Sequence, residues 1–450
     1  MALPRWVMKF GGTSVGDAAC VRAAGAIVSG HHERSPAVVV SAASGVTDEL
    51  IRLLAHAARG GSQQQAGLAS LVARHRTLLR ELELPAELLD SLFGELQELL
   101  EGVAVLRELT DRTRDRGLSY GERLLAPVFA AHLVRLGYDA RPWDAGELGL
   151  ITDDRHGRAR PLAEAYARIP KTLTRAGAHI PVITGFIGRT ASGETTTLGR
   201  GGSDYSASIV ARAVGAEVLQ IWTDVDGIMT ADPRIVAGAQ VLSTLSYGEA
   251  SELAYSGAKV LHPSTIAPAM EAGIPVLVLN SRQPHLTGTM ILGEPAPAPE
   301  GVVRSIAHKR GVQVVTVVSP RMLDRHGFLS RIAEAFNRHA VSIDMISTSE
   351  VSVSLTTSEG EHELAPVLAE LEGFSAVTLT RDRGMISVVG AGLGSTSEII
   401  ANLLQSVAAI GAQVEMISYG ATRLNFSFLV ADREVDRVVR ELHSVCFGSA

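Results

Sequence analysis

Apolar runs alternate with helical patterns along residues 1–295 of the chain. Five short runs predict buried strands, and each is followed by glycine or small polar residues and then by a helical pattern. They lie at residues 5–10, 37–40, 181–186, 218–223 and 274–279. Between residues 63 and 116, leucines recur at helical spacing and predict two or three amphipathic helices that cover a sheet. Strands that alternate with helices predict a largely parallel α/β sheet, with ligands at the carboxyl ends of its strands.

The pattern changes near residue 293, where Glu-Pro-Ala-Pro-Ala-Pro-Glu predicts a stiff linker. Beyond it, a predicted strand at 341–347 returns 71 residues later at 412–418. A helix precedes each copy and a further strand follows it, so we expect two βαββαβ units. The second unit ends after its last helix, and we therefore expect the two units to interleave their strands. The expected regions are an α/β domain at 1–295, a linker at 296–309, and repeats at 310–383 and 384–450.

Composition and charge narrow the class of protein. The 46% of hydrophobic residues and the formal net charge of −7 over 450 residues exclude a disordered chain. No apolar run approaches the roughly 20 residues that span a bilayer, and the start has no secretory pattern, so we expect a cytoplasmic protein without a membrane partner. Acidic residues are spread without basic blocks, which argues against nucleic acid as a partner. Cys20 and Cys446 have no metal or redox spacing.

The first of two glycine-rich segments follows the first predicted strand. It reads Lys-Phe-Gly-Gly-Thr-Ser-Val over residues 9–15. Gly11 and Gly12 let backbone N–H groups approach an anion, and Lys9 adds a full positive charge. The segment lacks the Gly-Lys-Ser/Thr ending of a Walker A loop. It therefore predicts a phosphate site of another type, although a tight turn beside a surface lysine would give the same pattern.

The second glycine-rich segment precedes a predicted helix at 205–214. It reads Thr-Thr-Thr-Leu-Gly-Arg-Gly-Gly-Ser-Asp over residues 195–204. Its amides again suit an anion, and the Arg200 guanidinium can bind a carboxylate through two parallel hydrogen bonds. Ser203 and Asp204 could equally be N-cap residues of the helix. Two anion-binding loops in one α/β domain favour phosphoryl transfer from a nucleotide to an acidic acceptor.

Three further segments place charged side chains beside glycine. They read Trp-Thr-Asp-Val-Asp-Gly at 222–227, Ser-Gly-Ala-Lys-Val-Leu-His-Pro at 256–263 and Tyr-Gly-Glu-Arg at 120–123. Each alone admits an ordinary structural role: turn formation at the Asp-Gly pair, a surface lysine at Lys259, and a helix start at Glu122.

In this order and spacing, the five segments resemble the aspartate kinases of the amino acid kinase family, and the similarity covers essentially the whole chain. It is greatest to the monofunctional, lysine-regulated type. The resemblance implies the amino acid kinase fold followed by two ferredoxin-like ACT domains. It also implies ATP-dependent phosphorylation of the β-carboxylate of L-aspartate to 4-phospho-L-aspartate, the first step towards lysine, methionine and threonine. Mg²⁺ would arrive with ATP, because no dedicated metal site is evident in the sequence.

The resemblance also implies roles for matching residues. Lys9 and Asp204 would be catalytic, the first neutralising charge on the transferring phosphoryl group and the second organising the reacting centre. Arg200 would bind a carboxylate of aspartate and Glu122 its ammonium. The full aspartate set would be Ser41, Thr47, Glu122, Arg200, Gly201, Gly202 and Ser203. The ATP set would be Lys9, Phe10, Gly11, Gly12, Thr223, Asp224, Met229, Arg234, Lys259 and Val260, with Met229 where the family often has tyrosine.

The C-terminal repeats match the lysine-binding pattern of the family at several positions. The expected effector residues are Met322, Arg325, Phe328, Leu329, Ser342, Ile343, Asp344, Ser349 and Glu350. Asp344 and Glu350 would supply carboxylates to a cationic effector. Arg325 stands where a small serine is usual and could repel lysine, so regulation by threonine, or no regulation, stays open. The resemblance further implies a homodimer through the ACT domains, or a tetramer.

Two other function classes fit the sequence less well. A kinase acting on glutamate, acetylglutamate or UMP would lack the tandem repeat, and Glu122 together with Arg200 favours a free amino acid. A non-enzymatic amino-acid sensor with a relic kinase domain would have lost Lys9, Arg200 or Asp204, and all three are present.

Overall fold

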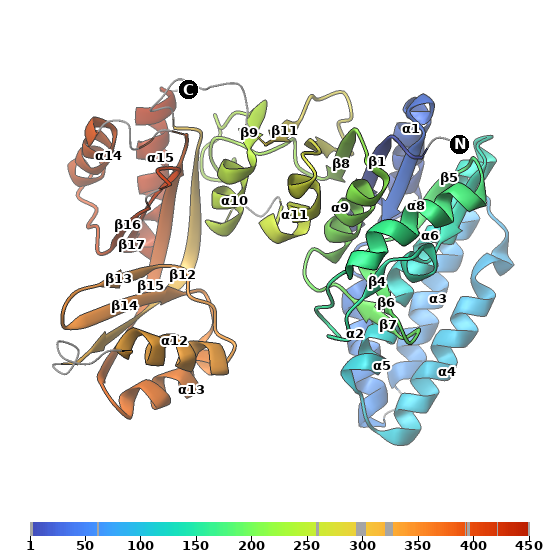
Figure 1. The fold of residues 1–450 in the computed structure, drawn as a ribbon, viewed down its shortest axis with the longest axis horizontal. Coiled ribbons are helices and arrows are strands. Elements are labelled where there is room, and N and C mark those ends of the chain that lie inside the picture. Colours follow the sequence, from blue (N-terminus) through green and yellow to red (C-terminus); the bar gives the residue numbers. More distant parts are fainter. Residues whose placement is uncertain are drawn as a thin grey trace. The chain divides into compact units, whose positions relative to one another are not determined.

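The computed structural model describes residues 3–60, 63–257, 261–293, 303–319, 327–391, 393, 397–420 and 422–448. Its contacts divide the chain into two compact units, which are described separately (Figure 1). Unit 1 comprises Met1–Ile228, Ser243–Tyr247 and Val260–Pro295, and unit 2 comprises Met229–Leu242, Gly248–Lys259 and Ala296–Ala450. Two segments of the expected α/β domain, 229–242 and 248–259, thus belong to the unit that contains the repeats.

An eight-stranded sheet forms the centre of unit 1, in the order β3-β5-β2-β1-β8-β10-β11-β9. Its strands are β1 (Trp6–Phe10), β2 (Pro36–Val40), β3 (Ala140–Trp143), β5 (Ile180–Thr184), β8 (Val218–Thr223), β9 (Thr244–Ser246), β10 (Val276–Asn280) and β11 (Thr289–Leu292). All neighbours pair in parallel except β10 and β11, which confirms the predicted largely parallel sheet.

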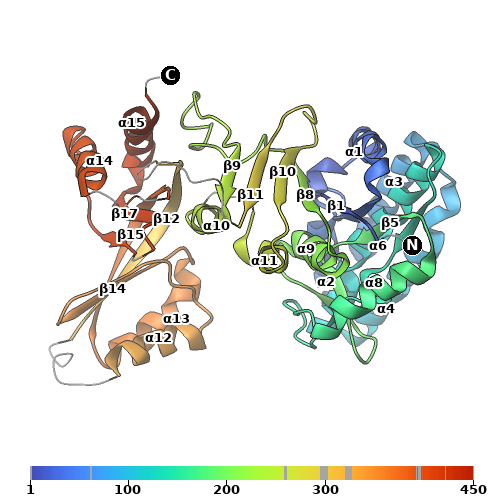
Figure 2. The same ribbon diagram turned by 45° about the horizontal axis from the view of Figure 1, so that its top comes forward.

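Helices cover both faces of this sheet (Figure 2). The alternation of side chains along β1 shows which helices lie on which face. Met8 and Phe10 join one core with helices α1, α2, α3, α4 and α6. Lys9 points to the opposite face, where α9 packs between α8 and α11. The helices of unit 1 are α1 (Ala18–Gly30), α2 (Val46–Arg59), α3 (Gln63–Glu81), α4 (Asp90–Leu106), α5 (Asp111–Leu118), α6 (Tyr120–Arg135), α7 (Ala145–Leu148), α8 (Ala163–Ala176), α9 (Gly202–Val214) and α11 (Pro263–Glu271).

The expectation that a helix follows each strand is wrong at three places. After β8, the chain reaches the strand β9 before the helix α10 (Tyr247–Tyr255) begins. After β5, the chain forms the antiparallel pair β6 (Ile187–Thr190) and β7 (Thr195–Thr197), which belongs to a small sheet with β4 (Ile151–Thr152). After β10, it continues into the antiparallel strand β11. The turn at Gly193, with a φ of 92°, reverses the chain between β6 and β7 within too few residues for a helix.

Unit 2 contains an antiparallel six-stranded sheet in the order β13-β14-β12-β15-β17-β16. Its strands are β12 (Ser305–Val318), β13 (Ile346–Thr348), β14 (Ser352–Thr357), β15 (Ala376–Val389), β16 (Ile417–Tyr419) and β17 (Asn425–Ala431). The central strands β12 and β15 pair from end to end, interrupted by a bulge near Lys309. One half of each lies in the first repeat and the other half in the second, so both strands serve both repeats (Figure 1).

Two pairs of helices complete unit 2. α12 (Phe328–Arg338) and α13 (Glu361–Glu372) share a core with β12 and β14, while α14 (Ser397–Ala409) and α15 (Val435–Phe447) share another with β15 and β17. Most of α10 (Tyr247–Tyr255) also belongs to this unit. The order of elements gives the two ferredoxin-like repeats that the sequence predicts. Within the described part of the chain, no helix is long and apolar enough to cross a membrane.

The predicted strands at 341–347 and 412–418 are mostly not strands. Only their last residues pair, as β13 and β16. The preceding Met345 and Met416 point into a shared apolar cluster instead. The apolar pattern of these segments therefore reflects burial. The N–H of Asp344 donates to the Thr356 carbonyl at 2.7 Å, and the N–H of Glu415 donates to the Leu429 carbonyl at 3.0 Å.

Candidate active site

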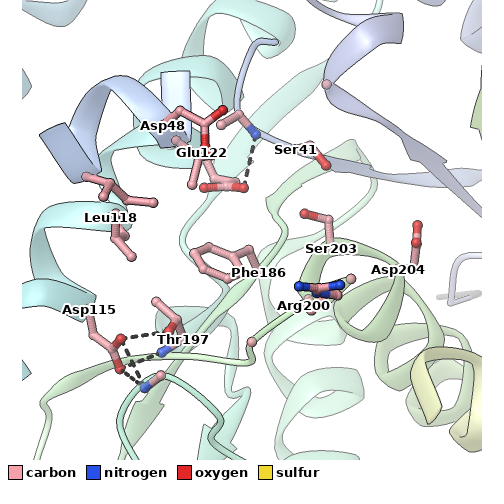
Figure 3. Close-up of a pocket in the computed structure, with 18 of the residues that line it drawn as sticks. Ser41, Asp48, Asp115, Leu118, Glu122, Phe186, Thr197, Arg200, Ser203 and Asp204 are labelled. Carbon is pink, nitrogen blue, oxygen red and sulfur yellow. Dashed lines mark hydrogen bonds between the residues drawn. The ribbon is translucent and has the colours of Figure 1, made fainter. Parts of the chain in front are cut away.

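A cavity of about 670 Å³ opens in unit 1 at the carboxyl ends of β1 and β2 (Figure 3). Its wall comes from the glycine-rich segment after β1, the loop after β2, the α5–α6 region and the segment between β7 and α9. Residues that the sequence singles out as catalytic or substrate-binding meet there. They are Lys9, Gly12, Ser41, Thr47, Glu122, Arg200, Gly201, Gly202, Ser203 and Asp204.

Lys9 and Asp204 form an ion pair at this cavity. The Nζ atom of Lys9 lies 2.6 Å from Oδ1 of Asp204, and both side chains are at most 15% exposed. Lys9 comes from β1 and Asp204 from the first turn of α9, so the pair joins the two glycine-rich segments. Low exposure keeps water away from the pair and strengthens its field on any phosphate placed beside it.

The first glycine-rich segment lies close to neighbouring backbone. The N–H of Gly11 donates to the Trp222 carbonyl at 3.0 Å, and the N–H of Ser44 donates to the Gly12 carbonyl at 3.2 Å. A Cβ atom on Gly12 would lie 2.9 Å from the Ala42 carbonyl oxygen, so this position requires glycine. The segment is thereby fixed between the loop after β2 and strand β8.

The start of α9 excludes the N-cap interpretation of Ser203 and Asp204. The helix begins at Gly202, three residues earlier than predicted, and its N-cap is Gly201 with a φ of 68°. Ser203 and Asp204 therefore lie in the first turn, where backbone N–H groups lack helical acceptors and suit an anion. The exposed Arg200 guanidinium just before it forms no hydrogen bond or ion pair with another described residue.

Glu122 is a buried carboxylate facing the cavity. Its Oε1 accepts a hydrogen bond from the Ala42 N–H at 3.0 Å, and among the described residues Oε2 has no hydrogen-bond partner. Burial raises the pKa of Glu122 from 4.5 to about 8. Glu122 is only 3% exposed, and a glutamate that merely begins a helix need not be buried. The structure therefore favours a role in which this carboxylate binds a ligand.

The raised pKa of Glu122 predicts a pH-dependent stability of the free protein. Between about pH 4.5 and 8 the folded state binds a proton at Glu122 that the unfolded chain has lost, so the free energy of unfolding falls as pH rises. Glu122→Gln keeps the shape and the Ala42 contact but removes the titration. The quantity to measure is the Tm of the variant minus the Tm of the unsubstituted protein, without substrate. This difference is expected to increase as the pH rises from about 4.5 to 8. If Tm depended on pH in the same way in both proteins, the raised pKa would not belong to Glu122.

The expected nucleotide residues are only partly at this cavity. Thr223 and Asp224 follow β8, the strand next to β1, and the Thr223 hydroxyl donates to the Asp224 carboxylate at 3.3 Å. The Phe10 side chain is fully buried and stacks on Trp222 at 6.0 Å, so only its backbone is available to a ligand. Met229 and Arg234 belong to unit 2, where Arg234 is paired with Asp232 at 2.6 Å. Lys259 and Val260 lie outside the described residues.

The expected effector residues belong to unit 2. Phe328 and Ile343 pack in one core, and the Asp344 carboxylate binds the Lys309 ammonium at 3.0 Å and the Ser358 hydroxyl at 2.6 Å. The remaining described members, Leu329, Ser342, Ser349 and Glu350, are exposed. Met322 and Arg325 lie outside the described residues.

The cavity also contains residues that the sequence did not single out. Phe186 lies in the left-handed region with a φ of 66°, and Gly202 leaves room for its ring, because a Cβ atom there would lie 2.6 Å from Cδ2 of Phe186. Asp115 lies in α5, within the stretch interpreted only as amphipathic helix. Its one signal is its position seven residues before Glu122 in a helical region.

Comparisons with known proteins agree with this architecture. The family model of the amino acid kinase family matches residues 4–280, and an ACT domain model matches residues 315–366 and 386–445. Aspartokinase 3, chloroplastic, of Arabidopsis thaliana is 38% identical over 98% of this chain and 81% of its own length. Lysine-sensitive aspartokinase 3 of Escherichia coli (strain K12) is 35% identical over 98% of this chain and 99% of its own length.

Solved structures give the same result. The crystal structure of E. coli aspartokinase III in complex with aspartate and ADP matches with a TM-score of 0.84 and 33% identity, covering 98% of this chain and 99% of that one. The same enzyme in complex with lysine and aspartate matches with a TM-score of 0.82 and 32% identity, covering 99% of this chain and 100% of that one. Because family models, full-length relatives and fold all agree, the chain belongs to the amino acid kinase family, as an aspartokinase with two C-terminal ACT domains.

Proposed function

We propose that the cavity of unit 1 transfers the γ-phosphoryl group of ATP to the β-carboxylate of L-aspartate, forming 4-phospho-L-aspartate. One observation carries this proposal: a single cavity holds the Lys9–Asp204 pair, the exposed Arg200 and the buried Glu122. The E. coli relative in complex with aspartate and ADP supports the same pair of substrates.

Aspartate would be bound by groups that complement its charges. The Arg200 guanidinium can bind a carboxylate with two parallel hydrogen bonds. Oε2 of Glu122, which has no hydrogen-bond partner among the described residues, can accept from the ammonium. Hydroxyl groups of Ser41, Thr47 and Ser203 line the same cavity and would donate to the remaining oxygens. A zwitterionic diacid needs one cation, one anion and neutral donors, and this set contains them.

Phosphoryl transfer would depend on positioning and charge neutralisation. Lys9 would stabilise negative charge on the transferring group, and Asp204 would hold Lys9 in place. Gly11 and Gly12 would let the phosphates of ATP approach the backbone, with the N–H of Gly12 as the donor, because the N–H of Gly11 already donates to the Trp222 carbonyl. Gly201 and Gly202 would let the start of α9 approach the acceptor. Thr223, Asp224, Met229, Arg234, Lys259 and Val260 stay predicted nucleotide contacts.

Mg²⁺ would enter with ATP. Within the described part of the chain, no cluster of three or more side chains is suited to hold a metal by itself. The donor chemistry fits an ion bound largely by water and nucleotide phosphates, because Asp204 offers a 15% exposed carboxylate beside Lys9. When bound, the ion would neutralise phosphate charge.

The acceptor specificity is tested by ADP release from MgATP with L-aspartate, L-glutamate or N-acetylglutamate. Turnover with aspartate, and at least about tenfold less with the other two, is expected, because the carboxylate of a longer acceptor is misplaced. Equal turnover with glutamate, or turnover only with the N-acetylated acid, would contradict the proposal.

We further propose that L-lysine inhibits the enzyme at the first repeat. Asp344 already binds one ammonium, that of Lys309, at 3.0 Å, so its surroundings suit the cationic end of lysine, which would compete with Lys309. The E. coli relative in complex with lysine and aspartate supports this choice. Inhibition by threonine instead, or by neither amino acid, would mean that the pocket differs from the family pattern, with Arg325 as the first residue to replace.

Asp344→Asn is expected to raise the half-inhibitory lysine concentration by about tenfold or more, because a charge-assisted contact is lost. Each variant is normalised to its own uninhibited rate. Asp436→Asn, on the exposed side of α15, is the control and should keep the original inhibition curve. An unchanged curve for Asp344→Asn would remove Asp344 from the effector site.

We also propose a homodimer, or a tetramer, built through the ACT repeats. Among the described strands, β13 and β16 are the two edges of their sheet, and Ile346, Ile417 and Tyr419 on them are each more than 40% exposed. Light scattering after gel filtration tests this assembly, and a monomer at micromolar concentration would contradict it.

A further inference from the structure

Asp115 has an unusually complete set of hydrogen bonds for a side chain that lines a substrate cavity. The residue is 1% exposed, and its carboxylate oxygens accept hydrogen bonds from four donor groups. The N–H of Gly157 lies 3.1 and 2.9 Å from its two oxygens, and the ring Nδ1 of His156 lies 3.0 Å from Oδ2. The N–H and the hydroxyl of Thr197 donate to Oδ2 and Oδ1 at 2.9 and 2.7 Å (Figure 3).

These bonds occupy the acceptor capacity of the carboxylate, which is about four lone-pair positions. Asp115 therefore has no free oxygen for a substrate. It differs in this respect from Glu122, whose Oε2 has no hydrogen-bond partner among the described residues. The structure thus separates a carboxylate that can bind a ligand from one that holds protein segments together.

The segments that Asp115 connects are those that carry the two charged residues for aspartate. Asp115 lies on α5, which ends at Leu118, and α6 begins at Tyr120 with Glu122 in its first turn. The N–H of Ser119 donates to the Asp115 carbonyl at 3.0 Å, so the helical path continues towards Glu122.

On the other side, Thr197 is the last residue of β7 and precedes Arg200 by three residues. Thr197 also pairs with Ile187 of β6, and its carbonyl accepts from the Ala159 N–H at 2.9 Å. Beyond Thr197, the segment is held by the N–H of Leu198, which donates to the Phe186 carbonyl at 2.9 Å, and by α9 from Gly202 onwards. Since Arg200 itself has no described partner, its position depends on these anchors at both ends of the segment.

We propose that Asp115 is a positioning residue that fixes the spacing between Arg200 and Glu122 and thereby determines the selectivity for aspartate over its one-carbon-longer homologue. The inference rests on the proposed binding roles of Arg200 and Glu122. A rigid spacing places the β-carboxylate of aspartate at the reacting position, whereas glutamate bound by the same groups extends too far. An error of about 1 Å in such a position is enough to cost about 100-fold in rate. Loosening the Thr197 anchor relaxes this discrimination.

The test is Asp115→Asn, because asparagine keeps the size but presents an NH₂ group to the N–H donors of Gly157 and Thr197. KM for aspartate is expected to rise about tenfold or more, and the ratio of kcat/KM for aspartate over glutamate to fall about tenfold. KM for ATP is expected to stay within about twofold, since the Lys9 segment is not connected to Asp115 by any hydrogen bond described above. A purely structural role would not split the two KM values in this way.

Asp153→Asn is the matched control. The Asp153 carboxylate accepts from the N–H groups of Arg155 and Arg160 at 3.4 and 3.0 Å, so it fixes the same 153–160 loop without contacting Thr197. This variant is expected to keep both KM values and the acceptor ratio. A change equal to that of Asp115→Asn would mean that the loop, and not the Thr197 anchor, is responsible, and would overturn the proposal.

A second pair of variants covers the case in which Asp115→Asn does not fold. Thr197→Val replaces the hydroxyl that donates to Asp115 by a methyl group, whereas Thr197→Ser keeps that hydroxyl. Thr197→Val is expected to shift KM for aspartate, and the ratio of kcat/KM for aspartate over glutamate, in the same direction as Asp115→Asn. Thr197→Ser is expected to keep the original value of both. Unchanged values in Thr197→Val, or equal losses of kcat with both acceptors at constant KM, would overturn the proposal.

If the unsubstituted enzyme shows no aspartate-dependent turnover, the proposed function fails instead. The failure of the proposed function is therefore distinct from the failure of the role of Asp115.

Discussion

Replacement of Lys9 by alanine is expected to lower kcat by about 1,000-fold, because the enzyme loses the cation placed for charge that develops during phosphoryl transfer. The side chain is 10% exposed and paired with Asp204 at 2.6 Å, so water cannot substitute for it fully. Steady-state ADP release measures the rate. Calorimetry measures aspartate affinity, which is expected to change little, since the proposed aspartate contacts lie elsewhere in the cavity.

Lys171→Ala is the matched control for this result. Lys171 lies exposed on α8, and its loss is expected to leave kcat unchanged. Because Lys9 and Asp204 act as a pair, the double variant with Asp204→Asn is expected to be little slower than the slower single variant. More than about a tenth of the original rate in Lys9→Ala would contradict the assigned role.

Glu122→Gln is expected to raise KM for aspartate by about two orders of magnitude, because the substrate ammonium loses a buried anionic partner. In the free enzyme, burial raises the pKa of Glu122 to about 8, so the carboxyl is mostly protonated at neutral pH. Binding of the ammonium favours the carboxylate, and aspartate binding at pH 7 is therefore expected to release a proton. As pH rises towards 8, more enzyme carries the carboxylate and KM for aspartate is expected to fall.

Calorimetry in buffers of different ionisation enthalpy measures this proton. In Glu122→Gln the binding enthalpy is expected to be independent of the buffer. Glu95→Gln is the control, because Glu95 binds Arg123 and Tyr120 of the same helix and does not line the cavity. A buffer-dependent enthalpy that persists in Glu122→Gln would assign the proton to another group.

The sequence predicts the residues of the cavity better than the connections between them. The two glycine-rich segments are recognisable because close backbone approach leaves a composition signal, as at Gly12. Asp115 leaves no such composition signal beyond its position in a helical region, since its hydrogen-bond donors come from residues 156, 157 and 197, which only the fold brings to it. Similarly, the segment at 341–347 shows an apolar pattern that indicates burial, and burial alone does not distinguish a paired strand from an extended segment above a core.

The two central strands of unit 2 have a consequence for how its repeats melt. The start of β12, Ser305–Lys309, pairs with Met385–Val389 of β15, and the second half of β12 pairs with the first half of β15. Neither repeat can therefore separate from the other without breaking the backbone hydrogen bonds that join β12 and β15 on both sides of the bulge. We therefore expect the tandem repeats to unfold as one cooperative unit, in which a destabilising substitution in either core lowers the stability of both.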